Sequence, residues 1–253
     1  MDWLGWLIFL GAAFIGSYVQ AVTGFAMGMI VIAVAGASGL IGLPVLTAAA
    51  SIISLVNIVF ALKGHTGSLH RPLVFWLALG QIPAIGVGVW LLTVLDRNLQ
   101  WLLQLLLGGF LIAGCLSMLL RPKPITRVSP PWAALTGGLA GGLIGGLFAA
   151  SGPVIGWFCY RQPLSLPAIR ASLLAFFALT SSSRTLIVGV QGGLTAEVLL
   201  LSMVAIPLVV LGTWLGRENP PPVSDEVLKR VVFALLLLMG CWILLGGLLE
   251  MGA

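Results

Sequence analysis

Long apolar segments alternate with short polar or glycine- and proline-rich stretches along the whole chain. The segments run approximately over residues 3–22, 24–38, 43–62, 72–95, 99–120, 132–147, 149–160, 165–189, 194–216 and 227–250. The stretch from Trp3 to Leu62 contains no Asp, Glu, Lys, Arg or His. A membrane-spanning helix needs roughly 20 apolar residues, so the pattern predicts a bundle of membrane-spanning helices.

The overall composition points to the same class of protein. Of 253 residues, 60% are hydrophobic and 8% are charged, whereas a soluble domain carries about 25% charged residues. The mean hydropathy is +1.15. We therefore expect an all-α integral membrane protein that crosses a cell membrane, with the lipid bilayer as its surroundings. Basic cytoplasmic loops account for the net charge of +5, so we expect no nucleic-acid partner.

One stretch near the middle of the chain interrupts the apolar pattern. Residues 121–131 contain four prolines and three basic residues and cannot form a helix interior. We expect a cytoplasmic linker here, between a first transmembrane repeat over 1–120 and a second over 132–253. When the first half is shifted by about 125 residues, Pro83 falls on Pro207, Gly88 on Gly212 and Trp90 on Trp214. Secondary transporters are commonly built from such repeats; chance similarity of apolar sequences is the alternative.

The distribution of basic residues predicts how the two halves are oriented. If each half crossed the membrane four times, the basic residues outside the spans would divide six against five across the membrane. If each opening segment instead crosses twice, or dips in and returns on its own side, only Arg97 falls on the second face. The first face then receives Lys63, Arg71, Arg121, Lys123, Arg127, Arg161, Arg170, Arg217, Lys229 and Arg230.

This second arrangement obeys the rule that cytoplasmic loops carry an excess of Lys and Arg. It predicts two inverted-topology repeats, each opening with a broken or re-entrant Gly-rich helix pair that is followed by three spans. It also predicts that both termini lie on the non-cytoplasmic side. Such a compact chain with an outside N-terminus is typical of a bacterial inner membrane.

The Gly-rich opening segments supply the first candidate site. They contain QAVTGFAMGM at 20–29 and GGLFAASGPVIG at 145–156. Glycines permit non-helical backbone, and a proline disfavours a helical lead-in. We expect each segment to break near the membrane midplane and to direct unpaired N–H groups at a central cavity that attracts an anion; close packing of small residues is the alternative. The predicted binding residues here are Gly24, Phe25, Ala26, Gly28, Ser151, Gly152 and Pro153.

A charge within an apolar segment supplies the second candidate site. Arg184 lies in the apolar segment FFALTSSSRTLIVGV, residues 176–190. An arginine at the bilayer centre costs at least roughly 2.5–3.5 kcal/mol on insertion scales, and the sequence places no carboxylate in the membrane core to pair with it. We expect Arg184 to provide the counter-charge for a bound anion, with snorkelling toward the headgroups as the alternative. The accompanying substrate-binding residues are Ser181, Ser182 and Ser183, with Asn57 at the matching place in the first half.

Other polar residues in the apolar segments favour structural roles. Gln20 and Gln81 are expected to make helix–helix hydrogen bonds. The cysteines, Cys115, Cys159 and Cys241, lack metal-ligand spacing and are typical of small packing residues. His65 and His70 lie in a loop that we expect at the headgroup level. We therefore expect no enzyme activity, no cofactor and no metal.

At this point the sequence resembles a known family. The openings GSYVQAVTGFAMGM and GGLAGGLIGGLFAASGPVIG, the stretch QPLSLPAIRASLLAFF from Gln162, and DEVLKRVVFALLLLMG from Asp225 are similar to the TauE/SafE family of sulfite exporters. The resemblance covers nearly the whole chain. It implies a transporter of a small anion such as sulfite, an organosulfonate or a related sulfur oxyanion. The chain departs from the family's glycine pattern at Ala26-Met27 and Ala149-Ala150-Ser151.

The sequence therefore predicts an exporter that binds a small anion between two half-helix ends at the membrane midplane. The anion would arrive through a cytoplasmic vestibule lined by Lys63, Arg161 and Arg170. A cation permease and a non-transporting membrane scaffold or assembly factor remain as alternatives. A homodimer is an open alternative to a monomer.

Overall fold

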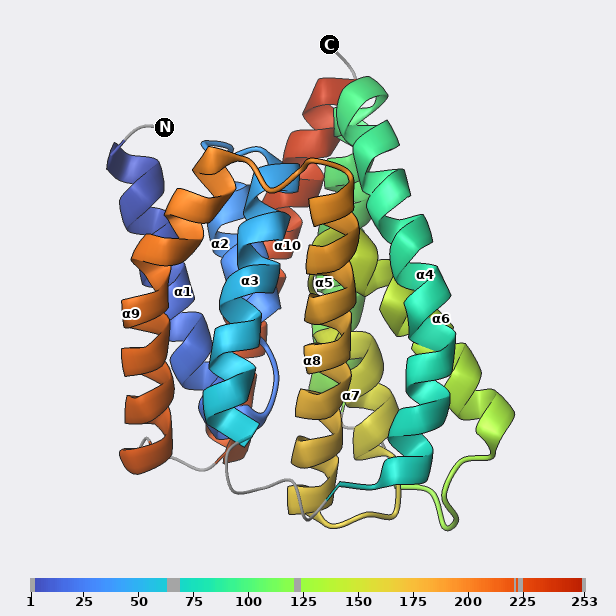
Figure 1. Ribbon diagram of the computed structural model, residues 1–253. Helices are drawn as coiled ribbons and strands as arrows, with labels where there is room; N and C mark the ends of the chain where they lie inside the picture. Colours follow the sequence, from blue (N-terminus) through green and yellow to red (C-terminus); the bar gives the residue numbers. More distant parts are fainter. Residues whose placement is uncertain (1–2, 63–68, 121–123, 221, 223–224, 252–253) are drawn as a thin grey trace.

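The computed structural model describes residues 3–62, 69–120, 124–220, 222 and 225–251. These residues form a bundle of ten helices (Figure 1). The helices are α1 (Trp3–Thr23), α2 (Met27–Ala37), α3 (Leu43–Leu62), α4 (Arg71–Asn98), α5 (Gln100–Leu119), α6 (Pro131–Phe148), α7 (Gly152–Tyr160), α8 (Leu166–Val190), α9 (Ala196–Glu218) and α10 (Asp225–Met251). Each predicted apolar segment corresponds to one of them, which confirms an all-α membrane protein.

Eight of the described helices are long and apolar enough to cross a membrane. The other two, α2 and α7, have 11 and 9 residues, so they rise by about 16 Å and 13 Å. Each therefore spans about half of a hydrocarbon core that is about 30 Å thick. Figure 1 shows that α1 and α2 enter and return at the upper end, whereas α6 and α7 do so at the lower end.

The two opening pairs are thus re-entrant, and their arms are unequal. The long arms, α1 and α6, have 21 and 18 residues and cross most of the bundle. The sequence predicted a broken or re-entrant helix pair in each opening, and in the structure each pair joins a long helix to a short one. We call residues 24–26 the first break and residues 149–151 the second break.

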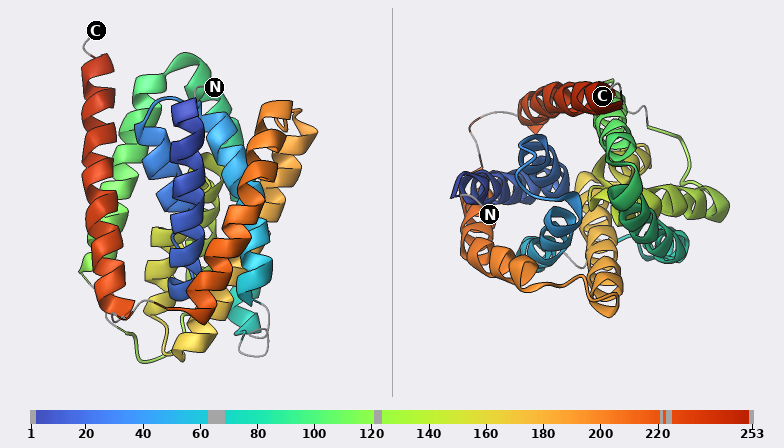
Figure 2. Two further views of the ribbon diagram at one scale, coloured as in Figure 1. Left: turned by 90° about the vertical axis from the view of Figure 1, so that its left-hand side faces the viewer. Right: turned by 90° about the horizontal axis from the view of Figure 1, so that it is seen from above.

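The two halves of the chain interlock rather than forming separate units. Helix α4 packs along α6, α9 along α1, and α5 along α10, while α3 packs against α8 and α9 and α8 also packs against α4. Figure 2 shows α9 beside α1 and α4 beside α6 on opposite sides of the bundle. If α1–α5 are matched in order with α6–α10, each of these helix contacts has an equivalent. The α4–α6 contact corresponds to α9–α1 and the α3–α9 contact to α8–α4, while the α5–α10 and α3–α8 contacts correspond to themselves. This pattern supports the inverted repeat, which stays a prediction.

Basic residues gather at the lower end of the bundle in Figure 1, which we call the basic end. Helices α4, α8 and α10 begin there, and α7 and α9 end there. The arginines on these helix ends and their flanking loops are Arg71, Arg127, Arg161, Arg170, Arg217 and Arg230. The opposite end carries Arg97, Asp96, Glu197 and Glu250. Of the predicted vestibule residues, Lys63 lies outside the described residues.

Glycines allow α4 and α6 to approach to backbone contact. A Cβ added at Gly88 would overlap the carbonyl oxygen of Leu143, and one added at Gly142 would lie 2.5 Å from that of Gln81. Close approach of this kind is how membrane helices associate without a hydrophobic driving force. The small-residue packing that the sequence offered as an alternative is therefore present, at the α4–α6 contact.

We expect Gly88→Ala to lower the thermal unfolding midpoint of the protein in detergent. The added methyl group meets the backbone of α6, and overpacking of this kind costs about 1–3 kcal/mol. Gly86→Ala is the matched control, because it lies on the same helix and a Cβ there meets nothing within 4 Å. Equal midpoints for the two variants would contradict the close packing of α4 on α6.

Candidate functional site

The first break turns the chain sharply between α1 and α2. Gly24 has a φ of 84° and Ala26 a φ of 101°, so both residues lie in the left-handed region. Gln20 stabilises the turn, since its Oε1 accepts a hydrogen bond of 3.1 Å from the backbone N–H of Met27 at the start of α2. Its Nε2 donates to Oδ1 of Asn57 on α3 at 2.7 Å. The predicted helix–helix hydrogen bond of Gln20 is confirmed.

The second break turns the chain between α6 and α7. Ala149 has a φ of 53°, and its N–H donates to the carbonyl of Gly145 at 2.9 Å, which ends α6. Pro153 lies in the first turn of α7, where the missing N–H would be unpaired in any case. The proline therefore helps to start α7, and the predicted break is confirmed at residues 149–151.

The two breaks meet inside the bundle. A Cβ added at Gly28 would overlap the carbonyl oxygen of Ala149, and one added at Gly152 would lie 3.4 Å from the ring of Phe25. Within the described residues, the backbone N–H groups of Gly28, Met29 and Gly152 have no acceptor. They belong to the first turns of α2 and α7, whose N-termini carry a partial positive charge. Two such helix ends are thus directed at one place.

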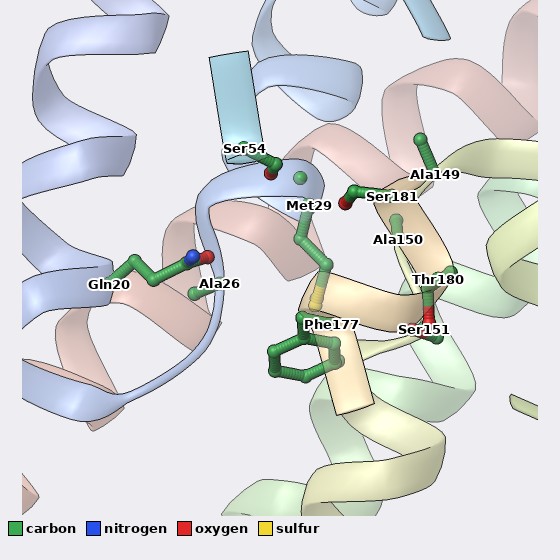
Figure 3. A pocket seen from close by; sticks show the side chains of 12 residues that line it. Gln20, Ala26, Met29, Ser54, Ala149, Ala150, Ser151, Phe177, Thr180 and Ser181 are labelled. Atoms are coloured by element: carbon green, nitrogen blue, oxygen red, sulfur yellow. The ribbon is translucent and has the colours of Figure 1, made fainter. Parts of the chain in front are cut away.

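A small polar cavity lies where the breaks meet (Figure 3). Its volume is about 30 Å³. The lining residues come from α1, α2, α3, α7 and α8 and from both breaks; they are Gln20, Ala26, Gly28, Met29, Ser54, Ala149, Ala150, Ser151, Gly152, Phe177, Thr180 and Ser181. None of these described residues is charged. A cavity needs about 10–15 Å³ to hold one water molecule, so this cavity is too small for a sulfonate.

Aromatic side chains pack together on the side of the cavity that faces the basic end. Phe25, in the first break, is 1% exposed. Its ring centroid lies 6.0 Å from that of Tyr160 and 5.7 Å from that of Phe233. The hydroxyl of Tyr160 donates to the carbonyl of Thr23 at 3.2 Å, which ties the end of α7 to the end of α1. These three rings lie between the cavity and the end where α8 and α10 begin.

Arg184 joins three helices on the other side of the cavity. Its side chain is 1% exposed. The guanidinium donates to the carbonyl of Gly146 at 3.0 Å, to the carbonyl of Thr47 at 2.6 Å, to the hydroxyl of Ser51 at 3.0 Å and to the hydroxyl of Thr47 at 2.6 Å. Arg184 therefore ties α8 to α3 and α6 and does not snorkel. Its partners are protein groups rather than lipid headgroups.

Arg184 lies about one helical turn from the cavity. Ser51, Gly146 and Arg184 each lie three residues from a lining residue, namely Ser54, Ala149 and Ser181. Helix α3 runs from the upper end in Figure 1, so Thr47 and Ser51 lie nearer that end than Ser54 does. The charge therefore stands beside the cavity on the side away from the basic end.

Comparison with known proteins identifies the family. Residues 8–243 match the protein family described as "Sulfite exporter TauE/SafE". The chain belongs to the TauE/SafE family. The "Probable sulfite/organosulfonate exporter TauE" of Cupriavidus necator is 39% identical over 242 residues, which cover 96% of this chain and 93% of that protein. The "Probable inner membrane transporter protein TsaS" of Comamonas testosteroni is 28% identical over 178 residues, 66% of this chain and 73% of that protein. No solved structure matches the chain.

Membership of the TauE/SafE family shows that the protein is a multi-pass membrane transporter and not an enzyme. The family that the sequence resembled is thereby confirmed. The match covers both halves of the chain and both breaks.

The cavity of this TauE/SafE protein contains part of the predicted set of binding residues. Ala26, Gly28, Ser151, Gly152 and Ser181 line it. The other predicted residues do not line it; they are Gly24, Phe25, Asn57, Pro153, Ser182, Ser183 and Arg184. Ser182 and Ser183 follow Ser181 on α8. Each residue of an α-helix is rotated by about 100° from the one before it, so their side chains point away from the side of α8 that faces the cavity.

The predicted set of binding residues omits several residues that line the cavity. Thr180 and Ser54 have buried hydroxyl side chains. Thr180 directly precedes the predicted Ser181, and Ser54 lies one helical turn before the predicted Asn57. Thr180 donates to Oε1 of Gln81 at 2.9 Å, so Gln81 also joins two helices as predicted. The signal for Ser54 was its spacing, since Thr47, Ser51 and Ser54 repeat at i, i+4 and i+7 on one face of α3.

The predicted vestibule is only partly described. The side chain of Arg170 packs on the first break, where its Cγ lies 3.2 Å from a Cβ added at Gly24. The guanidinium of Arg161 instead lies 4.5 Å from the ring centroid of Trp157, a residue that is 37% exposed on the outside of the bundle. Arg170 is thus placed beside the first break, and Arg161 is placed on an outer surface.

A larger cavity at the opposite end is unsuited to an anion. Its volume is about 320 Å³, and Asp96 and Glu250 line it together with Gln100 and Gln104. The carboxylate of Glu250 accepts a hydrogen bond of 2.9 Å from Gln104. Because like charges repel an anion, this cavity is less suited to binding an anion than the uncharged cavity at the two breaks.

The left-handed alanines predict a test of strain at the breaks. Ala26→Gly is expected to raise the free energy of unfolding by about 1 kcal/mol, since a φ of 101° is costly for any residue with a Cβ. Ala149→Gly should change it little, because a φ of 53° lies in the αL well and the flexibility of glycine in the unfolded chain offsets the gain. Equal effects of the two changes on denaturation in detergent would contradict this account.

Proposed function

We propose that this TauE/SafE protein exports a small sulfur oxyanion, sulfite or an organosulfonate, through the cavity at the two breaks. One observation carries the proposal: the N-termini of α2 and α7, with unpaired N–H groups, converge on an uncharged cavity lined by hydroxyls. Helix N-termini bind anions through these N–H groups and the helix dipole. The relative from Cupriavidus necator, named as a probable sulfite/organosulfonate exporter, supports the choice of substrate.

The charges around the cavity favour an anion over a cation. Arg184 stands one turn away as a full positive charge, and residues 98–196 contain no Asp or Glu. An oxyanion in the cavity would accept hydrogen bonds from Ser54, Ser151 and Ser181 and from the backbone of α2 and α7. A cation would face the positive ends of two helices and an arginine, with no carboxylate among the lining residues.

For transport, the cavity must open first toward one end of the bundle and then toward the other. The rings of Phe25, Tyr160 and Phe233 close the side of the basic end. Arg184 closes the other side by joining α8 to α3 and α6. We infer that the anion enters when the rings part, and that it then competes with Thr47 and Ser51 for the guanidinium. Release of Arg184 from α3 would open the way out.

The sidedness follows from the distribution of arginines. We propose that the basic end is cytoplasmic, in keeping with the excess of Lys and Arg on cytoplasmic loops, and that both termini lie outside a bacterial inner membrane. An inside-negative potential then favours anion export by about 2.3 kcal/mol per charge for each 100 mV. A separate coupling ion is not required for export in this scheme.

Sulfite efflux from proteoliposomes tests the proposal. Vesicles loaded with sulfite and carrying the purified protein should release it with saturable kinetics, and protein-free vesicles should not. An organosulfonate such as sulfoacetate should compete, whereas acetate should compete poorly because it has fewer acceptor oxygens. A well-folded sample that releases none of these anions above the protein-free background would refute the proposal.

A further inference from the structure

Helices α5 and α7 enclose a groove that faces outward from the bundle. Its volume is about 260 Å³, and its lining is almost entirely apolar. On α5 the lining residues are Phe110, Ala113, Gly114 and Ser117, which share one helix face at i, i+3, i+4 and i+7. On α7 they are Pro153, Val154 and Trp157. Since both helices lie in the membrane, this groove is open to lipid.

The groove is as deep as one leaflet. Helix α7 has 9 residues and rises by about 13 Å, which is about half of a hydrocarbon core about 30 Å thick. It ends at the basic end with Tyr160, directly before Arg161. A transmembrane helix of a second copy would need a groove across the full membrane. A single acyl chain from the leaflet of the basic end matches this depth.

Arginine marks the headgroup end of the groove. The guanidinium of Arg161 stacks over Trp157, with its Cζ 4.5 Å from the ring centroid, and Trp157 also lines the groove. A stacked guanidinium keeps its N–H donors in its own plane, and within the described residues none of them has a hydrogen-bond acceptor. These donors match the oxygens of a phosphate.

The linker over residues 124–130 carries a second arginine close to Arg161 in the chain's fold. The N–H of Ile125 donates to the carbonyl of Arg161 at 2.8 Å, and the N–H of Ser129 donates to Oε1 of Gln162 at 2.9 Å. Arg127 lies between these two attachment points and is exposed. No Asp or Glu occurs between Asp96 and Glu197 in the sequence, so no neighbouring part of the linker, α5, α6 or α7 supplies a competing carboxylate.

We propose that this groove binds an anionic phospholipid, with one acyl chain between α5 and α7 and its phosphate at Arg161. The lipid would support α7 from outside the bundle. The N-terminus of this helix forms one wall of the central cavity, and α5 touches it directly, since a Cβ added at Gly114 would lie 2.7 Å from Cβ of Pro153. The site does not depend on which anion the transporter carries.

Native mass spectrometry of the detergent-purified protein tests this site. The sample receives equal amounts of phosphatidylglycerol and phosphatidylcholine, and the retained lipid is counted. Ala113→Trp fills the groove from an exposed position, and Arg161→Gln removes the charge at its end. Leu116→Trp is the matched control, because Leu116 is 44% exposed on the same helix and does not line the groove.

The native protein and Leu116→Trp should retain phosphatidylglycerol over phosphatidylcholine by about fivefold. Ala113→Trp and Arg161→Gln should lose this preference while keeping the native unfolding midpoint. Equal retention of the two lipids by the native protein, or unchanged retention by Ala113→Trp, would overturn the proposal. A native dimer that Ala113→Trp converts to monomers would also overturn it, because the groove would then be a contact between two copies.

Discussion

Arg184→Gln is expected to abolish nearly all sulfite transport and to weaken the fold as well. Two unit charges about 7 Å apart in an effective dielectric of about 20 interact by about 2.4 kcal/mol, so losing the charge should weaken anion affinity by about 50-fold. Arg184 also satisfies Gly146, Thr47 and Ser51. Leaving several of these groups unpaired should cost about 2–4 kcal/mol of stability.

Arg184→Lys separates the two contributions. Lysine keeps the charge but lacks the planar guanidinium that donates hydrogen bonds to α3 and α6 at the same time. This variant should therefore lose almost as much stability as Arg184→Gln loses. It should nevertheless bind sulfite clearly more tightly than the glutamine variant. If both variants lose affinity to the same extent at equal folded fraction, then the charge of Arg184 takes no part in attracting the anion.

Gly28→Ala is expected to reduce transport by about 5- to 150-fold, since overpacking against backbone costs about 1–3 kcal/mol and also displaces the binding groups. The new methyl group would overlap the carbonyl oxygen of Ala149, which cannot rotate away as a side chain could. The N-termini of α2 and α7 would then move apart, and their N–H groups would no longer converge. Efflux from proteoliposomes, corrected for folded protein, measures the effect.

Gly36→Ala is the matched control for this change. It lies on the same short helix, and a Cβ there would meet side-chain atoms no closer than 3.6 Å, which is ordinary contact. This variant should transport at nearly the native rate. Native transport by Gly28→Ala would mean that the contact between the two breaks is not needed for function, and comparable losses in both variants would mean that any alanine on α2 is damaging.

Much of the architecture could be predicted because local sequence encodes it. Apolar length placed α3 at residues 43–62, as observed, and placed α5 to within one residue at each end. Glycines and Pro153 marked both breaks, since these residues alter the backbone wherever they occur. The apolar segments of the two openings already had unequal lengths, at 3–22 and 24–38 and at 132–147 and 149–160. They did not show that α2 begins only at Met27 and α7 only at Gly152.

The central cavity was harder to predict because distant residues form it. The sequence singled out Arg184 as a candidate, yet its partners Thr47 and Ser51 lie 137 and 133 residues earlier in the chain. Local periodicity cannot reveal such contacts. Ala26 and Ala149 were noted as departures from a glycine pattern, and both have positive φ. The alanine at position 26, with a φ of 101°, holds the first break in a strained conformation.

Equilibrium binding of radiolabelled sulfite to the purified protein tests the central claim that the anion binds at the crossing of the two breaks. Ser181 lines the cavity, whereas Ser202 is a buried serine on α9 that does not line it and whose hydroxyl donates to the carbonyl of Val198. A hydrogen bond to a charged group contributes about 1.5–3 kcal/mol, so Ser181→Ala should raise the Kd at least about tenfold, while Ser202→Ala should leave it unchanged. An unchanged Kd for Ser181→Ala, or an equal rise for Ser202→Ala, would contradict the claim.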